Sequence, residues 1–461
     1  MSNYIGRPCT QCAQRASTVY NVCTKLSRNL HAIHTKVRQR KVSTLQSPLP
    51  IYPLRLQLNE AKTWCDSGEW ELGVLGQRLL RKTDHLTVKT SSSCRTFMYT
   101  EAGTRPLLND TQEFEIKSVE TSNFVQRICQ NSPMTDRSDS LYFTAPVADI
   151  GSLDKLPGWE NLIVSDIPPD STLGETLSAP TMSCWIGEPG VVTQAHYDVA
   201  NNIFVQLHGQ KEITFYHPNQ APNLYVFPDA HPRSRKSQVD FDQPNLLQFP
   251  GFASAEKWQT VILNPGDAVY IPSFWFHHVE ALTTSVSVNC FSESILKFYA
   301  ASIFNHKIDK LAAVRTHKNV KRKKELVVDF VAQLIAGLGL RKDFVQQLYH
   351  SRYSPLDISA AATKSESFCQ RSQKEPVFAG IELNKRVLSQ ECNDAWNLEL
   401  APLYTIFDKI RGPDKQADKD TSYSSGVVEI VASHLVEFWV VRLFGSKNAG
   451  PVLRQLSEDE F

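Results

Sequence analysis

The stretch Thr193-Gln-Ala-His196-Tyr-Asp198 is the most informative in this chain of 461 residues. On a β-strand, side chains two positions apart project from the same face. The imidazole of His196 and the carboxylate of Asp198 can therefore converge on one point and chelate a metal ion. Taken alone the pattern is weak, because about one His-x-Asp is expected by chance in a chain of this composition.

Two adjacent histidines lie about 80 residues further along, in Ile271-Pro-Ser-Phe-Trp275-Phe-His277-His278. They follow the turn Asn264-Pro-Gly-Asp267 within a region of the same β character. Two histidines and one carboxylate make the facial triad of non-haem Fe(II) oxygenases, which leaves coordination positions open for a cosubstrate and dioxygen. Zinc more often takes a closed tetrahedral set of ligands. The combination therefore favours iron.

Residues 181–293 are organised as short runs that alternate between apolar and polar residues and are separated by turn residues. We expect Asn202–His208 and Lys211–Tyr216 to form a hairpin around Gly209-Gln210, and Ser285–Phe291 to place its apolar residues on one face. Short strands at this spacing predict an antiparallel sandwich or barrel. The chain has no Gly-x-Gly-x-x-Gly or Walker sequence, which argues against a Rossmann or P-loop fold.

In order along about 110 residues, from Trp185-Ile-Gly187 to Val288-Asn289, these motifs resemble the JmjC-type, cupin-fold Fe(II)/2-oxoglutarate-dependent oxygenases. The likeness is greatest to the branch that contains the asparaginyl hydroxylase of hypoxia-inducible factor and the wybutosine tRNA hydroxylase. The resemblance implies a mainly β fold with α additions. The implied fold is a double-stranded β-helix, or jelly roll, with an α+β N-terminal region and a helical C-terminal region. It also implies Fe(II) as cofactor and 2-oxoglutarate as cosubstrate.

Residue by residue, the resemblance assigns His196, Asp198 and His277 as the iron ligands that carry catalysis. The family spaces its last ligand as Trp-x-His, and Trp275 therefore selects His277 over His278. His278 should then point to the opposite face, in a structural or supporting position.

The resemblance also assigns a cosubstrate pocket. Lys211 matches the lysine that holds the distal carboxylate of 2-oxoglutarate, a point-charge role suited to an ammonium; the alternative is a surface lysine beside the Gly209-Gln210 turn. Thr193 and Tyr142 match hydroxyl groups that complete the carboxylate pocket. Asn202 and Asn289 match amides that line it, with a hydrogen bond at a turn or strand edge as the alternative for each.

The substrate does not carry over from the family. The asparaginyl hydroxylase meets its substrate's amide with an Arg-Gln pair, and this chain has Arg235-Lys236 there. Hydroxylation of a protein side chain is the first expectation, so a protein is the expected partner. The alternatives are a tRNA-base hydroxylase of the wybutosine type, an N-methyl demethylase, and a catalytically silent cupin that acts as a binding module. The basic residues of the first 59 positions and the basic run Lys318–Lys324 support the tRNA alternative.

Charge is nearly balanced over the whole chain, with 49 Lys plus Arg against 48 Asp plus Glu, which argues against a dedicated nucleic-acid binder. Residues 1–59 contain basic but no acidic side chains. Such a leader is typical of an organelle transit peptide, and a solvated basic tail is the alternative. No apolar run is long enough for a secretory signal or a membrane span. We expect an intracellular protein of the cytoplasm or nucleus, with mitochondrial import as the alternative, and no membrane partner.

The sequence divides into four segments, and the last of them contains the strong apolar element Val427–Phe444. This element is apolar on most of its circumference and must be buried, either in its own domain or in a homodimer formed by the C-terminal helices. The segments are a basic leader at 1–50 that is disordered or targeting, an α+β lead-in at 51–180, the JmjC/cupin catalytic core at 181–295, and a helical region at 296–461 with polar linkers at 354–376 and 412–426.

Overall fold

The structure is a computed structural model that describes residues 49–92, 95–97, 114–130, 139–167, 179–316, 318–356, 390–412 and 420–458. The predicted basic leader lies almost entirely outside the described residues. So do most of the predicted linker at 354–376 and part of the linker at 412–426. Among the helices of the described part, none combines the length and apolar character that a bilayer span requires.

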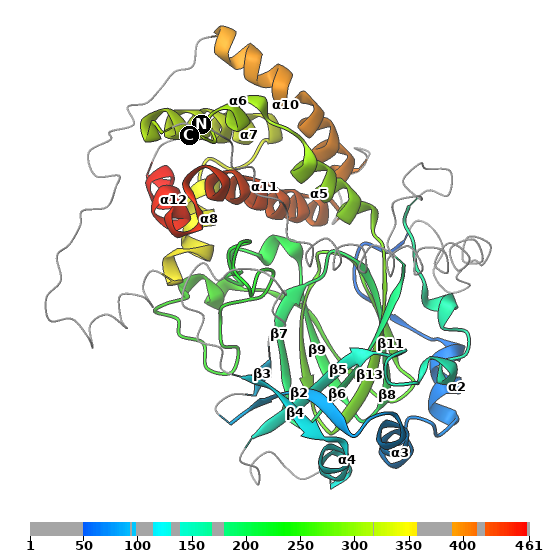
Figure 1. Cartoon of the computed structure of the whole chain (residues 1–461). Coiled ribbons are helices and arrows are strands. Elements are labelled where there is room, and N and C mark those ends of the chain that lie inside the picture. The colour runs from blue at the N-terminus through cyan, green and yellow to red at the C-terminus, as the bar shows by residue number, and fades with distance from the viewer. Residues whose placement is uncertain are drawn as a thin grey trace, which may run out of the picture.

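Two β-sheets face each other and form the sandwich in the lower half of Figure 1. One has eight strands in the order β1-β11-β8-β13-β6-β5-β2-β4, and the other has five in the order β10-β9-β12-β7-β3. The mainly β, jelly-roll architecture expected from the sequence is confirmed. The strands are β1 (Leu54–Leu56), β2 (His85–Ser91), β3 (Thr96–Phe97), β4 (Glu115–Glu120), β5 (Ser140–Pro146), β6 (Thr181–Gly187), β7 (Val192–Tyr197), β8 (Asn201–His208), β9 (Lys211–Tyr216), β10 (Lys257–Leu263), β11 (Ala268–Ile271), β12 (Phe276–Ala281) and β13 (Ser285–Ser292).

Helices lie in two groups. The first three cover the eight-stranded sheet near the N-terminal end of the described chain, and the others form a layer at the opposite end of the sandwich (Figure 1). They are α2 (Asn59–Asp66), α3 (Leu72–Lys82), α4 (Thr121–Gln130), α5 (Ile295–Asn305), α6 (Asp309–Ala313), α7 (Val320–Leu338), α8 (Phe344–Arg352), α10 (Gln390–Arg411), α11 (Asp420–Phe444) and α12 (Ala449–Ser457).

The alternation of β13 shows why the two faces of the large sheet differ. Val286, Val288 and Cys290 are buried in one hydrophobic cluster with residues of α2, α3 and α4. Ser287 and Asn289 occupy the alternate positions and face the interior of the roll. The sheet therefore packs apolar side chains against the helices and presents polar ones to the cavity.

The connection at Gly209-Gln210 corrects one prediction. Strands β8 and β9 are not a hairpin: β8 pairs with β11 and β13 in the large sheet, and β9 pairs with β10 and β12 in the small one. The tight turn crosses between the sheets. Gly209 has φ +67°, and a Cβ there would lie 2.1 Å from the carbonyl oxygen of Thr284, so only glycine fits this crossing.

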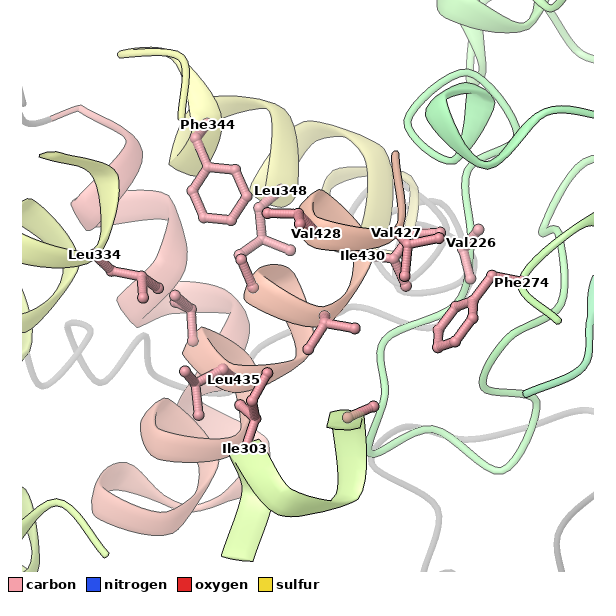
Figure 2. Packing of buried hydrophobic residues seen from close by; sticks show 14 of the residues in the cluster. Val226, Phe274, Ile303, Leu334, Phe344, Leu348, Val427, Val428, Ile430 and Leu435 are labelled. Atoms are coloured by element: carbon pink, nitrogen blue, oxygen red, sulfur yellow. The ribbon is translucent and has the colours of Figure 1, made fainter. Parts of the chain in front are cut away.

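Helix α11 lies in the middle of the C-terminal layer and is buried on nearly all sides. Its apolar residues share one continuous core with the neighbouring helices and with the jelly roll. Figure 2 shows Val427 and Ile430 of α11 beside Val226 and Phe274 of the β region. Gly426 permits this approach, because a Cβ there would lie 2.4 Å from the backbone nitrogen of Asn219. This chain itself therefore buries the helix, and nothing supports the alternative of a homodimer contact.

Helix α7 begins earlier than the basic run suggests. Asn319 caps it by accepting a hydrogen bond from the backbone N–H of Arg322, so most of Lys318–Lys324 lies in the first turns. Lys324 is buried and donates to the side chain of Gln455. Lys323 donates from Nζ to the carbonyl oxygens of Arg315 and Leu443. Part of the basic run is therefore used to hold the helices together.

Candidate functional site

The predicted triad is assembled by two neighbouring strands of the five-stranded sheet. Strands β7 and β12 pair with His196 opposite His277, and Asp198 follows the last residue of β7. One ligand atom from each of the three lies within 4.8 Å of the others. The rings of His196 and His277 have centroids 4.2 Å apart, and Nε2 of His277 lies 3.7 Å from Oδ2 of Asp198. Within the described residues this is the single group of three or more His, Cys, Asp or Glu that could hold a metal ion.

Both histidines are held in the orientation that a metal ligand needs. Nδ1 of His196 lies 2.8 Å from the carbonyl oxygen of Gln194, and Nδ1 of His277 lies 3.1 Å from that of Trp275. Each carbonyl accepts the proton of Nδ1–H in the neutral ring, so each Nε2 presents a lone pair. The backbone thus fixes the tautomer that can coordinate a metal.

The charges around the triad favour a neutral imidazole and an ionised carboxylate. Loss of water around the ring lowers the pKa of His196 to about 3, although the ring is partly open to the cavity, and His277 adds to the effect. Burial opposes ionisation of Asp198, but His196, His277 and the nearby cations hold its pKa below the usual value. These are the protonation states of metal ligands.

A cavity of about 490 Å³ opens beside the triad, between the two sheets. Its volume lies in the range of sites for small molecules, about 300–1,000 Å³. Its lining combines the three ligands with hydroxyl, aromatic and basic side chains from both sheets. The residues are Tyr142, Thr144, Ala145, Pro146, Thr181, Ser183, Trp185, Thr193, His196, Tyr197, Asp198, Phe204, Lys211, Arg235, Lys236, His277, Val279, Asn289 and Phe291.

Lys211 lines this cavity and is buried, so the alternative of a surface lysine is wrong. It is 2% exposed, its Nζ donates to Oγ of Ser287 at 2.8 Å, and it lies 5.5 Å from the centre of the Phe204 ring. Burial lowers its pKa to about 7, and no carboxylate of the described residues contributes to that shift. A buried cation of this kind suits an anionic ligand, whose charge would hold the proton on Nζ.

The hydroxyl groups named from the sequence meet in the same cavity. The hydroxyl of Tyr142 on β5 lies 2.9 Å from Oγ1 of Thr193 on β7, and the Tyr142 ring stacks on Trp185. The pair therefore joins the two sheets at the cavity wall. It offers two hydroxyl groups to a bound carboxylate.

The two amides are paired with each other. Nδ2 of Asn289 donates to Oδ1 of Asn202 at 3.0 Å, and Asn289 lines the cavity whereas Asn202 lies behind it. Oδ1 of Asn289 and Nδ2 of Asn202 have no hydrogen-bond partner among the described residues. Buried polar atoms normally find a partner in protein, water or ligand. Asn289 can therefore contact a ligand, and Asn202 can orient Asn289.

His278 points away from the triad, as its place in the strand predicts. Its ring stacks on Phe241 at 4.7 Å with the planes 14° apart, and burial lowers its pKa to about 4. Sequence reasoning missed part of the cavity lining, namely Thr181 and Ser183 of β6 together with Phe291. The alternation of β6 toward Trp185 could have indicated those two hydroxyl groups.

The donor set and its surroundings fit Fe(II) and 2-oxoglutarate. Two imidazoles and a carboxylate on one side of a cavity match the ligands that non-haem Fe(II) uses. The buried Lys211, which has no acidic partner among the described residues, matches a dicarboxylate that reaches past the triad.

Comparison with known proteins points to the same fold. Residues 70–297, about half of the chain, match the family model of the cupin-like domain. The tRNA wybutosine-synthesizing protein 5 of Danio rerio is 40% identical over 107 residues, which are 23% of this chain and 31% of that protein. Lysine-specific demethylase 8 of Xenopus tropicalis is 36% identical over 124 residues, 27% of this chain and 28% of that protein. Lysine-specific demethylase JMJ31 of Arabidopsis thaliana is 32% identical over 124 residues, 27% of this chain and 23% of that protein. The match thus spans less than a third of the length of each of these relatives.

Proposed function

The chain carries a cupin-like domain of the JmjC type over residues 70–297, and from that premise we propose that it is an Fe(II)- and 2-oxoglutarate-dependent oxygenase that hydroxylates a protein side chain. One observation carries the proposal. The three ligand atoms, within 4.8 Å of one another, open on a cavity that also contains the buried ammonium of Lys211. A binding module without catalysis would need neither the open triad nor the buried cation.

Each residue has a defined task in this proposal. His196, His277 and Asp198 would hold Fe(II) through Nε2, Nε2 and a carboxylate oxygen, and the carbonyls behind the rings place the proton of each neutral ring on Nδ1, which leaves Nε2 for the metal. Bound Fe(II) and 2-oxoglutarate would supply the activation of dioxygen that oxidation of an unactivated C–H bond requires. Lys211 would pair with the distal carboxylate, and the hydrogen-bonded Tyr142–Thr193 pair would donate a hydroxyl proton to it.

The charged lining supports a protein as the substrate. Beyond the triad and Lys211, the charged residues of the cavity are Arg235 and Lys236, and the rest of the wall is hydroxyl, aromatic or apolar. A wall with two local cations suits one side chain of a polypeptide better than a polyanion, which needs an extended positive groove. The basic run at 318–324 supports a tRNA groove less than its sequence suggests, because Lys323 and Lys324 bind within the fold.

A tRNA base remains the second candidate, because one of the relatives described above is a tRNA wybutosine-synthesizing protein at 40% identity. Other relatives are named lysine-specific demethylases. Removal of an N-methyl group begins with hydroxylation of the same kind of C–H bond, so the site would serve that reaction without change in its ligands. The substrate, and not the metal centre, separates these outcomes.

The test uses the purified full chain. It is incubated without oxygen with Fe(II), 2-oxoglutarate and a cell extract, and oxygen is then admitted. We expect succinate to form and a protein of the extract to gain the mass of one oxygen atom. A gain of oxygen in tRNA nucleosides would favour the second candidate, and loss of a methyl group from lysine would favour demethylation. Succinate no greater than that formed by the His196→Ala/His277→Ala double variant would contradict the proposed function.

A further inference from the structure

Tyr197, the last residue of β7, lies between His196 and Asp198 in the chain; it borders the cavity, but its ring and hydroxyl contact the C-terminal side of the strand. It is 1% exposed, it stacks on Phe274, and its hydroxyl lies 3.1 Å from Nε2 of His434 on α11. The two residues are separated by 237 positions in the chain. The strand that carries His196 and leads to Asp198 is therefore attached to the C-terminal helices by its last residue.

The second nitrogen of His434 faces another part of the site. Nδ1 lies 3.4 Å from Oδ1 of Asp229, and burial lowers the pKa of His434 to about 4, so the ring is neutral and carries one N–H. The tautomer with the proton on Nδ1 points it at the Asp229 carboxylate. Nε2 can then accept the hydroxyl proton of Tyr197. One imidazole thus joins Asp229 to the ligand strand.

Asp229 begins the segment 229–237, which returns to the cavity. Arg235 and Lys236 of this segment line the cavity. The backbone N–H of Tyr197 donates to the carbonyl of Arg235 at 3.3 Å, and Ser237 donates to the carbonyl of Ala195 at 2.8 Å. The segment 229–237 therefore contacts the ligand strand through Arg235 and Ser237, and it contacts His434 through Asp229.

Two further contacts of α11 reach the same elements. Glu437, one turn after His434, accepts from the backbone N–H of Asp229 at 3.2 Å and from Arg352 of α8 at 2.7 Å. Tyr423 donates its hydroxyl proton to the carbonyl of Ser273, just ahead of the strand that carries His277, at 2.8 Å. Helix α11 thus binds beside both ligand strands and at the start of the cavity wall.

We propose that His434 is a positioning residue of the oxygenase site, which sets the ligand strand through Tyr197 and the Arg235–Lys236 wall through Asp229. The proposal rests on the proposed function, because it makes the C-terminal helices part of the catalytic unit. His434 touches neither metal nor substrate in this role. It acts on the geometry of the groups that do.

The test compares two variants of the full chain in α11. His434→Phe keeps an aromatic ring in the core but removes both contacts of the imidazole. Leu435→Ala opens a cavity at a buried neighbour that has no contact with Tyr197 or Asp229 among the described polar contacts, and it serves as the control for general loss of packing. Co(II) is the probe, and its affinity and visible absorption spectrum are measured together with the melting temperature.

We expect His434→Phe to bind Co(II) about tenfold more weakly, the size of one buried hydrogen bond, and to show an altered spectrum. Leu435→Ala should lower the melting temperature at least as much and leave the Co(II) spectrum unchanged. Tyr197→Phe should reproduce the effect of His434→Phe without adding to it in the double variant. His434→Gln, whose carbonyl can accept the Tyr197 proton, should restore most of the affinity.

Equal loss of Co(II) affinity in His434→Phe and Leu435→Ala would overturn the proposal, because the role would then be structural only. Unchanged Co(II) binding in His434→Phe, or no Co(II) binding by the wild type, would overturn it as well. The proposed function fails separately. If the wild type forms no succinate while its Co(II) spectrum depends on His434, the positioning role stands and the oxygenase assignment falls.

Discussion

The jelly roll and the C-terminal helical layer contribute to the same site in different ways. The jelly roll supplies every predicted ligand and cosubstrate contact from strands that are close in space and follow simple alternation. Among its described residues the helical layer supplies no lining residue of the cavity, yet α11 is hydrogen-bonded to Tyr197 of β7 and to Ser273, just ahead of β12. The predicted site contacts thus come from one region, and in the positioning proposal above the other region fixes their geometry.

The largest expected effect follows from substitution of the predicted ligands in the jelly roll. His196→Ala, Asp198→Ala and His277→Ala each remove one of three ligands, so each should abolish succinate formation with iron in excess. His278→Ala should retain substantial turnover, because that ring stacks on Phe241 and faces away from the triad. Succinate formation under matched conditions is the measurement. An active His277→Ala beside an inactive His278→Ala would reverse the ligand assignment.

The next effect belongs to the helical layer and is one of stability. Arg352 and Glu437 form an ion pair of 2.7 Å in which both side chains are buried. Arg352→Met leaves the Glu437 carboxylate without its cation, which should cost about 3–5 kcal/mol of the free energy of unfolding. The double variant Arg352→Met/Glu437→Leu removes both charges and should recover most of that loss. Urea unfolding measures both, and a double variant less stable than Arg352→Met would contradict this account.

The next prediction concerns Lys211, which lines the cavity of the jelly roll. Lys211→Met keeps most of the side-chain volume but removes the charge, so 2-oxoglutarate should bind more weakly by about 2–5 kcal/mol, the loss typical of a buried charged partner. Mn(II) binding should change little, because Nζ is bonded to Ser287 and is not one of the triad. Calorimetric titration of 2-oxoglutarate into the Mn(II)-loaded variant measures the effect. An unchanged affinity would place the distal carboxylate elsewhere, with Arg235 as the next residue to test.

Much of the fold could be predicted because its signals are local. The alternation of β13 placed Val286, Val288 and Cys290 against the helices, and the spacing of His196 and Asp198 placed two ligands together. The hairpin at Gly209-Gln210 was wrong because a two-residue turn has the same local sequence whether it joins paired strands or crosses between sheets. The crossing is decided by the contact of Gly209 with Thr284, which is distant in sequence.

The helical layer was less predictable for the same reason. Helix α10 was not foreseen, because Pro402 interrupts its pattern and polar segments flank it. Its buried residues Trp396, Leu400, Leu403 and Phe407 nevertheless recur at helical spacing and could have indicated it. The pairing of His434 with Tyr197 leaves no sequence pattern at all, because 237 residues separate the two.

The smallest expected effect measures that pairing through pH. Burial lowers the pKa of His434 to about 4 from an ordinary value of 6.5, against the attraction of Asp229 and with the repulsion of Arg352 and Arg235. The folded state therefore resists protonation that the unfolded state accepts, so the stability due to the neutral ring is complete above pH 6.5 and is lost as pH falls toward 4. The loss should be about 1.4 kcal/mol for each pH unit in that window.

Glu437 works in the opposite sense, because burial raises its pKa to about 7 and its contribution to stability declines as pH rises. The useful quantity is therefore the difference in unfolding free energy between the wild type and His434→Phe, in which Glu437 largely cancels. We expect this difference to move by that slope in favour of the variant as pH falls from 6.5 to 4, whereas Leu435→Ala, which removes a buried apolar side chain and no titratable group, should give a difference that does not follow the same slope. A flat difference for His434→Phe would mean that the ring is not held neutral between Tyr197 and Asp229, and the helical layer would then be joined to the ligand strand by packing alone.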